Sequence, residues 1–218
     1  MVRVKVCGIT SLDDALLVAD AGADALGFIF VEGTPRYVTP SDAAKIIAAL
    51  PPFVCAVGVF WDHPPAQVRA VVDACGLGAV QLHGAEPPEA VAAASVPVLK
   101  TVKVGAPGDL AALDRYRPAA FLLDSPARWS QGEARTPIPW TLARQAAARA
   151  RIVLSAGLTP ETVAEAIRVV RPFAVDVNSG VEAAPGRKDP DKVRRFVRAA
   201  RAAGTELEPV APPGGLLG

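Results

Sequence analysis

Short apolar runs alternate along the whole chain with Ala-rich segments that have helical spacing, and a polar break separates each run from the segment that follows it. Continuous runs of Val, Ile, Leu and Phe are typical of strands in a parallel sheet, because both faces of such a sheet are buried. The pattern predicts eight strands, at residues 2–6, 25–30, 54–60, 79–82, 98–102, 120–123, 152–154 and 174–177.

A predicted helix follows each strand. The first predicted helix follows a Ser11 cap and ends at about residue 21, and the seventh follows a Thr159 cap and ends at about residue 170. The third begins near residues 64–65, where proline suits the first turn. The other five helices are predicted at residues 40–50, 87–94, 109–114, 140–150 and 190–203. Eight strand–helix units in this length predict an α/β protein with a single (β/α)8 barrel over residues 1–204. A doubly wound sheet is the alternative, but such sheets usually stop at about five or six strands. Residues 205–218 contain Pro and Gly without periodicity, so we expect a disordered tail there.

Composition narrows the function classes. The 51% hydrophobic content argues against intrinsic disorder, and the formal net charge of +1 lacks the basic excess of a nucleic-acid binder. No apolar stretch approaches the length of a membrane-spanning helix, so neither nucleic acid nor membrane is an expected partner. Cys7, Cys55 and Cys75 are an odd number of widely spaced cysteines, which favours a reducing compartment and a cytoplasmic protein.

Active sites of such barrels lie at the carboxyl ends of the strands, which makes Cys7 and Asp124 candidates for chemistry. A Cys7 thiolate could abstract a proton, although a lone cysteine is more often plain core. Asp124 follows a buried run, and partial burial disfavours the charged carboxylate, which suits a general acid. A loop-bracing aspartate is the alternative at that position.

Small residues end the seventh and eighth strands, at Ala156-Gly157 and Ser179-Gly180. Small side chains let a ligand approach the backbone, and these two loops are where barrels often bind phosphate. Either glycine alone is explained equally well by a turn of the chain. The pair, in the expected loops, favours phosphate binding.

Three other polar residues lie at the predicted catalytic end of the barrel. Arg36 lies in a long loop and could grip a carboxylate or phosphate, unless it is merely solvated. Gln81 and His83 end the fourth strand, where His83 could act as a base, bind ligand or be structural. The chain has no zinc-type Cys or His spacing and no nucleotide-binding glycine motif, so no metal or cofactor is expected. The residues thus predict acid/base chemistry on a small phosphorylated molecule.

Five sequence blocks on the predicted strand ends lie in a specific order. They are Lys5-Val6-Cys7-Gly8-Ile9-Thr10, Pro35-Arg36-Tyr37-Val38, Val80-Gln81-Leu82-His83-Gly84, Leu122-Leu123-Asp124 and Val177-Asn178-Ser179-Gly180-Val181-Glu182 with Pro185-Gly186 after it. In this order the chain, from about Val2 to Ala202, resembles the phosphoribosylanthranilate isomerases of tryptophan biosynthesis. The resemblance implies a cofactor-free (β/α)8 barrel. It also implies conversion of N-(5'-phosphoribosyl)anthranilate to 1-(2-carboxyphenylamino)-1-deoxyribulose 5-phosphate by an acid/base Amadori rearrangement.

The resemblance also implies roles for single residues. Cys7 would take the proton from ribose C2, Asp124 would protonate the ring oxygen, and Arg36 would bind the anthranilate carboxylate. Gln81 and His83 would support the site, and the two glycine-containing loops would hold the phosphate. Two separated groups for two proton transfers agree with the general logic of acid/base catalysis. The expected partner is the phosphorylated substrate, and the protein is expected to be a monomer or homodimer.

The chain departs from the family pattern in three places. The stretch Trp129–Ala134 retains only Gly132 of a glycine-rich loop, and Asn178 stands where Ser is common. Ala156 replaces a glycine, which should be tolerated if its φ is negative. Competing hypotheses are another phosphosugar barrel, such as a pentose-phosphate epimerase or the two-aspartate isomerase of histidine biosynthesis, and a barrel that only binds a ligand.

Overall fold

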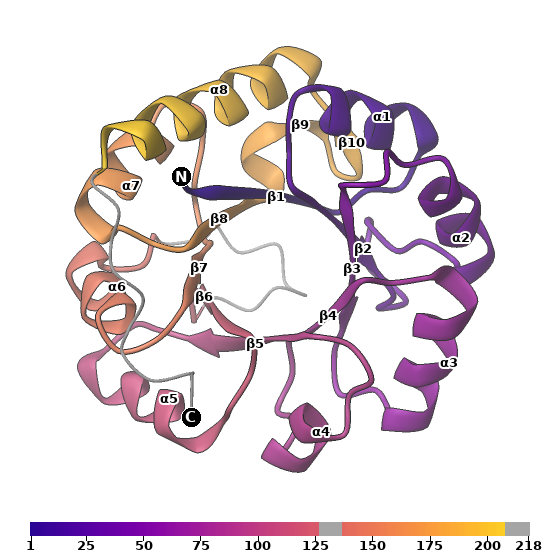
Figure 1. Cartoon of the computed structure of the whole chain (residues 1–218), viewed down its shortest axis with the longest axis horizontal. Helices are drawn as coiled ribbons and strands as arrows, with labels where there is room; N and C mark the ends of the chain where they lie inside the picture. The colour runs from indigo at the N-terminus through magenta and orange to yellow at the C-terminus, as the bar shows by residue number, and fades with distance from the viewer. Residues whose placement is uncertain (127–136, 208–218) are drawn as a thin grey trace.

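Eight parallel strands close into a ring in the computed structural model, and helices surround the ring (Figure 1). The structure describes residues 1–126 and 137–207. Each strand pairs with the next, and β8 pairs with β1 to close the barrel. The strands are β1 Arg3–Cys7, β2 Ala25–Ile29, β3 Cys55–Phe60, β4 Ala79–Leu82, β5 Val98–Lys103, β6 Ala120–Asp124, β7 Ile152–Leu154 and β8 Ala174–Val177. The predicted barrel is confirmed, and no predicted strand end differs from the observed one by more than one residue.

The helices form the outer layer that Figure 1 shows around the strands. They are α1 Leu12–Asp20, α2 Pro40–Ala48, α3 Pro65–Cys75, α4 Pro88–Ala92, η1 Pro107–Ala111 with α5 Ala112–Arg115, α6 Trp140–Ala147, α7 Val163–Val170 and α8 Pro190–Glu206. The predicted cap of α1 is confirmed, because the Ser11 hydroxyl accepts a hydrogen bond from the Asp14 N–H at 3.2 Å. In the described part of the chain, no helix is long and apolar enough to cross a membrane.

Two predicted boundaries are wrong. Thr159 does not cap α7, because its hydroxyl accepts from the Glu161 N–H within a separate turn and the helix begins only at Val163. The last helix continues to Glu206, beyond its predicted end at residue 203, and Ala203 and Gly204 in its last turns are buried. A Cβ at the buried Gly204 would lie 2.9 Å from the Val2 nitrogen, which shows how closely helix and β1 approach. The remainder of the predicted tail, 208–218, lies outside the described residues.

Strand residues alternate between the two faces of the barrel wall. One set packs outward against the helices in the main hydrophobic core, as Val4, Val6, Val175 and Val177 do. The other set faces the barrel interior, where Leu99, Ala120, Leu122, Val153 and Ala174 form a separate apolar cluster. The same inward positions also carry polar residues, namely Lys5, Gln81, Thr101, Lys103, Asp124 and Asp176. The interior is therefore apolar at one level and polar toward the carboxyl ends of the strands.

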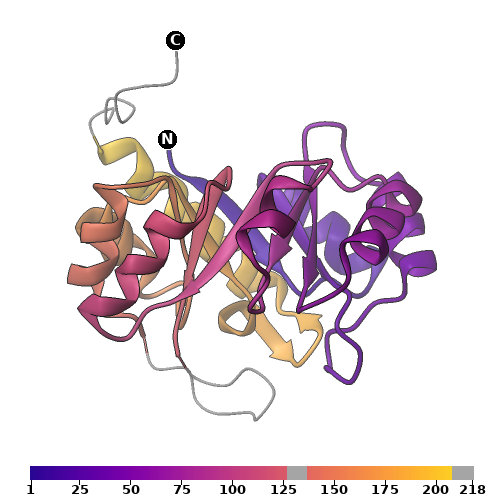
Figure 2. The ribbon, with the colours of Figure 1, turned by 90° about the horizontal axis from the view of Figure 1, so that it is seen from below.

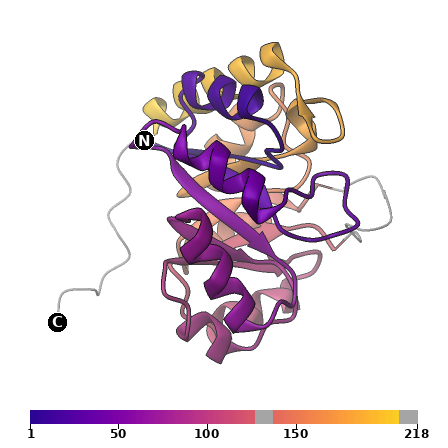
Figure 3. The same cartoon turned by 90° about the vertical axis from the view of Figure 1, so that its right-hand side faces the viewer.

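A β-hairpin that the sequence pattern did not predict follows β8. After the 3-10 turn η3 (Ser179–Val181), the hairpin consists of β9 (Glu182–Ala184) and β10 (Arg187–Lys188). It projects on the side of the barrel opposite the N-terminus, together with the loop between β2 and α2 (Figures 2 and 3). The hairpin is tied to the end of β1, because the Thr10 hydroxyl donates to the Gly186 carbonyl at 2.6 Å.

Candidate active site

Cys7 ends β1 and faces the barrel interior, where its side chain is buried. Its neighbour across the strand pair is Gly27 on β2, and a Cβ there would lie only 2.7 Å from the Cys7 sulfur. The glycine therefore provides the room that the thiol occupies. Burial raises the pKa of the Cys7 thiol, while the nearby ammonium groups of Lys5 and Lys188 act in the opposite direction.

Asp124 ends β6 and is also buried, but its surroundings differ from the apolar setting that the sequence suggested. Its Oδ2 accepts a hydrogen bond from Lys103 Nζ at 2.5 Å and lies 3.2 Å from His83 Nε2. Gln81 Nε2 lies 2.9 Å from His83 Nδ1, and Lys103 Nζ lies 3.1 Å from His83 Nε2. Trp61 stacks on the His83 ring at a centroid distance of 5.2 Å. The structure thus brings Gln81 and His83 next to the Asp124 carboxyl, together with Lys103, which was not among the predicted site residues.

Arg36 is held by a carboxylate of the hairpin rather than being solvated. Its Nε and Nη2 donate to the two carboxylate oxygens of Glu182 at 2.8 and 2.6 Å, and its side chain is only 15% exposed. Lys188 Nζ donates to Glu182 Oε1 at 3.1 Å, to Asn178 Oδ1 at 3.2 Å and to the Cys7 carbonyl at 2.6 Å. One buried network therefore joins the Arg36 loop, the hairpin and the end of β1. Glu182 and Lys188 were not among the predicted site residues, because nothing in the local pattern predicted the hairpin.

The two predicted phosphate loops lie in contact with each other. A Cβ at Gly180 would lie 2.0 Å from the Leu158 carbonyl oxygen, so the η3 turn packs directly on the loop after β7. Within residues 1–126 and 137–207, no hydrogen bond occupies the backbone N–H groups of Ala156, Gly157, Ser179 or Gly180. Backbone N–H groups without an internal partner can donate to an anion.

The condition set for Ala156 is not met. Ala156 has a φ of +67° and Gly157 has a φ of +73°, so both residues adopt the left-handed conformation. That conformation strains any residue with a Cβ, because the Cβ crowds the following carbonyl oxygen. The condition under which the alanine was expected to be tolerated therefore does not hold, and Ala156 has a strained backbone at the predicted phosphate site.

The remaining predictions concern the altered loop and metals. The stretch Trp129–Ala134 lies outside the described residues. In the part of the chain that the structure describes, no group of three or more His, Cys, Asp or Glu side chains is placed to hold a metal ion.

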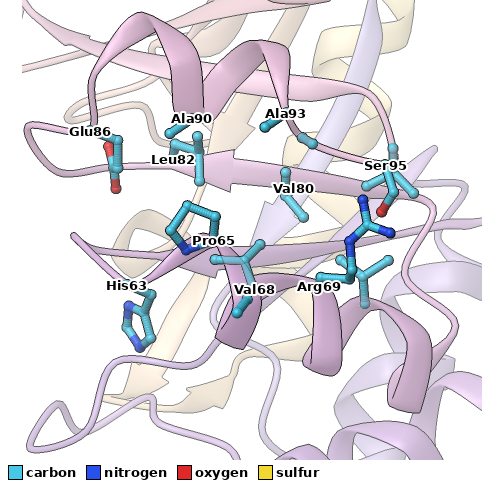
Figure 4. Close-up of a pocket in the computed structure, with 14 residues that line it drawn as sticks. His63, Pro65, Val68, Arg69, Val80, Leu82, Glu86, Ala90, Ala93 and Ser95 are labelled. Carbon is cyan, nitrogen blue, oxygen red and sulfur yellow. The ribbon is translucent and has the colours of Figure 1, made fainter.

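A cavity of about 280 Å³ lies away from these residues, on the outer side of the barrel between α3 and α4 (Figure 4). Its lining is mostly Ala, Val and Pro side chains, and it contains none of the strand-end groups described above. The groove exists because α4, with five residues, is too short to cover the neighbouring part of α3.

A family model described as N-(5'phosphoribosyl)anthranilate (PRA) isomerase matches residues 4–199. The chain belongs to the PRA isomerase family. A relative in this family, the N-(5'-phosphoribosyl)anthranilate isomerase of Pelobacter propionicus, is 50% identical over 92% of this chain and 96% of its own length. The crystal structure of the Thermotoga maritima PRA isomerase covers 93% of this chain and 100% of its own, with 46% identity and a TM-score of 0.87.

Another PRA isomerase structure contains reduced 1-(o-carboxyphenylamino)-1-deoxyribulose 5-phosphate. It has 45% identity and a TM-score of 0.84, and it covers 93% of this chain and all of its own. The family membership that the strand-end blocks indicated is therefore confirmed.

Proposed function

We propose that Cys7 and Asp124 divide between them the two proton transfers of the PRA isomerase reaction. In that reaction the enzyme converts N-(5'-phosphoribosyl)anthranilate, an aminoaldose, into 1-(2-carboxyphenylamino)-1-deoxyribulose 5-phosphate, an aminoketose. The proposal rests on the positions of the two residues. Cys7 is the last residue of β1 and Asp124 is the last residue of β6, and both face the interior at the same end of the barrel. In barrels of this type the active site lies at that end.

Asp124 is the proposed general acid. Its carboxyl group delivers a proton to the furanose ring oxygen, the bond from that oxygen to C1 breaks, and a protonated Schiff base forms at C1. His83 and Lys103 hold one carboxyl oxygen, at 3.2 and 2.5 Å, and so fix the direction of the other. A fixed acid that lies close to the leaving oxygen is what general acid catalysis requires.

Cys7 is the proposed general base. Its thiolate takes the proton from C2, and the C2–H electron pair forms the C1–C2 double bond of an enolamine while the Schiff base nitrogen is neutralised. Ketonisation of the enolamine then gives the product without any external oxidant or reductant. A thiolate at the end of β1 lies in the barrel mouth, where the sugar carbon must be placed for this transfer.

Arg36 and the two glycine-containing loops are the proposed binding groups for the ends of the substrate. Within the described residues, Nη1 of Arg36 makes no hydrogen bond, so it is available to the anthranilate carboxylate while Glu182 holds the other side of the guanidinium. The backbone donors of Ala156, Gly157, Ser179 and Gly180 are available to the phosphate.

We also propose a cellular compartment and an oligomeric state for the enzyme. The free thiols of Cys7, Cys55 and Cys75 agree with a reducing compartment, so we place the enzyme in the cytoplasm. One solved structure is described as monomers generated from the dimeric phosphoribosylanthranilate isomerase of Thermotoga maritima, and the dimeric state of that relative favours the homodimer over the monomer for this chain as well.

A fluorescence assay that generates the substrate in situ, in the presence of EDTA, tests the residue roles. Cys7→Ala and Asp124→Ala should each nearly abolish turnover while the folded variants still bind the reduced product analogue, and Arg36→Ala should mainly raise KM. Cys75→Ala and Asp114→Ala are matched controls outside the site and should keep parental turnover. Substantial kcat in Cys7→Ala would refute the base assignment. An unchanged KM in Arg36→Ala would refute the carboxylate contact.

A further inference from the structure

A buried ion pair lies inside the barrel, directly below Cys7. Lys5 precedes Cys7 by two residues on β1 and so shares its inward face. Its Nζ donates to Asp176 Oδ1 at 2.9 Å, and both side chains are almost fully buried, with 4% and 6% exposure. Asp176 is the residue of β8 that stands opposite Lys5 in the strand register.

Lys5 also approaches the cysteine sulfur. The point where a Cβ of Gly27 would stand is 3.1 Å from Lys5 Nζ and 2.7 Å from Cys7 Sγ. The ammonium nitrogen and the sulfur both lie beside the position of a Gly27 Cβ, so the two atoms are near neighbours inside the barrel. Replacing a buried ion pair by apolar side chains of similar volume is often neutral or stabilising. A pair next to the apolar layer of Leu122 and Val153 is thus poorly explained by stability alone.

We propose that Lys5, kept charged and in place by Asp176, is a positioning residue that stabilises the thiolate of Cys7 for proton abstraction. This inference rests on the proposed role of Cys7 as the base. Lys5 acts through the sulfur, since it is buried below it and does not reach the barrel mouth on its own.

Four charged groups act on the sulfur. They are Lys5 on β1, Asp176 on β8, Lys188 on β10 and Arg36 in the loop after β2. Burial raises the pKa of the Cys7 thiol and Asp176 adds to this, whereas Lys5 and Lys188 lower it. Burial also disfavours charge on Lys5, but Asp176 and Cys7 outweigh it, so the pKa of Lys5 is raised. The amine is therefore a cation, and a cation beside a thiolate stabilises it.

The test measures the titration of the Cys7 thiol directly. In a Cys55→Ala/Cys75→Ala background Cys7 is the only thiol, and the ultraviolet absorbance of the thiolate against pH gives its pKa. Removing Lys5 alone would leave Asp176 buried without its partner, so the variant is the pair Lys5→Met/Asp176→Leu. The pKa of Cys7 should rise by about one unit or more. The value of kcat at neutral pH should fall about tenfold, with partial recovery at higher pH and little change in KM.

Two further variants make the result decisive. Asp176→Asn has nearly the same shape and removes the anion that keeps Lys5 charged, so it should raise the pKa of Cys7, as the double variant does. A fall in the pKa of Cys7 would overturn the proposal, because Asp176 would then act on the sulfur directly and not through Lys5. Lys100→Met/Glu86→Leu removes a comparable buried pair (2.7 Å) on the outer side of the strands and should leave the Cys7 titration unchanged. The proposal is overturned if Cys7 has the parental pKa in both Asp176→Asn and the double variant. If the double variant does not fold, a parental pKa of Cys7 in Asp176→Asn alone overturns the proposal. Turnover by Cys7→Ala would instead refute the base assignment.

Discussion

Glu182 holds Arg36 through two hydrogen bonds, from Nε at 2.8 Å and from Nη2 at 2.6 Å, although the two residues are 146 positions apart in the chain. Glu182 is itself fixed by Lys188 Nζ at 3.1 Å and by the Gly186 N–H at 3.3 Å. The planar guanidinium is therefore held in one orientation, and within the described residues its Nη1 makes no hydrogen bond. Binding groups that are fixed in advance lose less entropy when the ligand arrives.

The first prediction concerns this orientation. Glu182→Gln replaces the charged, two-point contact by a neutral one, so Arg36 should lose its fixed direction. We expect KM to rise about tenfold, or about 1.4 kcal/mol, with a smaller change in kcat. Glu206→Gln, which breaks an exposed ion pair with Arg168 at the end of α8, is the control and should leave KM unchanged. Equal KM values in the two variants would contradict the role given to Glu182.

The second prediction concerns stability in acid. Burial by itself raises the pKa of Glu182, but the Arg36 hydrogen bond and the Lys188 charge together lower it below the ordinary 4.5. Its carboxylate therefore adds stability that is complete above pH 4.5 and is lost as the pH falls through the lowered value. Glu182→Gln should cost about 2–3 kcal/mol at neutral pH, measured by urea unfolding, and this difference should shrink in acid. A difference that does not depend on pH would show that the charge of Glu182 is not what stabilises the fold.

The third prediction uses the strained backbone at Ala156. Since Ala156 has a φ of +67°, Ala156→Gly should relieve the crowding of its Cβ. The flexible glycine costs some entropy in return, so a net stabilisation of about 0.5–1 kcal/mol is expected in urea unfolding. Ala70→Gly, in the interior of the right-handed helix α3, is the control and should destabilise by about 1 kcal/mol. If both glycine variants changed the free energy of unfolding in the same direction, the result would argue against strain at Ala156.

The fourth prediction tests the contact between the two phosphate loops. A methyl group at Gly180 would lie 2.0 Å from the Leu158 carbonyl oxygen, so Gly180→Ala must push the loops apart. We expect weaker binding of inorganic phosphate and a KM raised at least about tenfold, whereas kcat at saturation changes less. Gly108→Ala is the control, because no heavy atom lies within 4 Å of a Cβ there. Normal phosphate binding by Gly180→Ala would place the phosphate elsewhere.

Local pattern was sufficient for the barrel. The apolar runs located every strand to within one residue, because strands buried on both faces must be apolar almost throughout. The rule that barrel sites lie at the carboxyl ends of strands then selected Cys7 and Asp124 from the sequence. The same period of two could have found Lys5 and Asp176, since each is a charged residue on the inward face of a predicted strand. Lys103 continues the inward row of the strand predicted at 98–102 and lies one residue beyond its predicted end.

Loop and hairpin geometry could not be predicted in this way. Thr159 was predicted to cap α7, but it caps a separate turn, and the helix begins four residues later at Val163. The local sequence does not distinguish these two cases, because in both the threonine hydroxyl accepts from a neighbouring backbone N–H group. The left-handed φ of Ala156 was also unforeseen, since an alanine by itself favours the right-handed region.

The sequence by itself determined the strand and helix order, the inward positions and the end of the barrel where chemistry occurs, because these follow from short-range periodicity. Only the tertiary structure decided which distant charges meet. Closure of the barrel brings β8 beside β1, which pairs Lys5 with Asp176 across 171 positions, and the hairpin after β8 brings Glu182 to Arg36. Coulomb energies depend on distance in space and on burial, and neither is encoded at any single position of the chain.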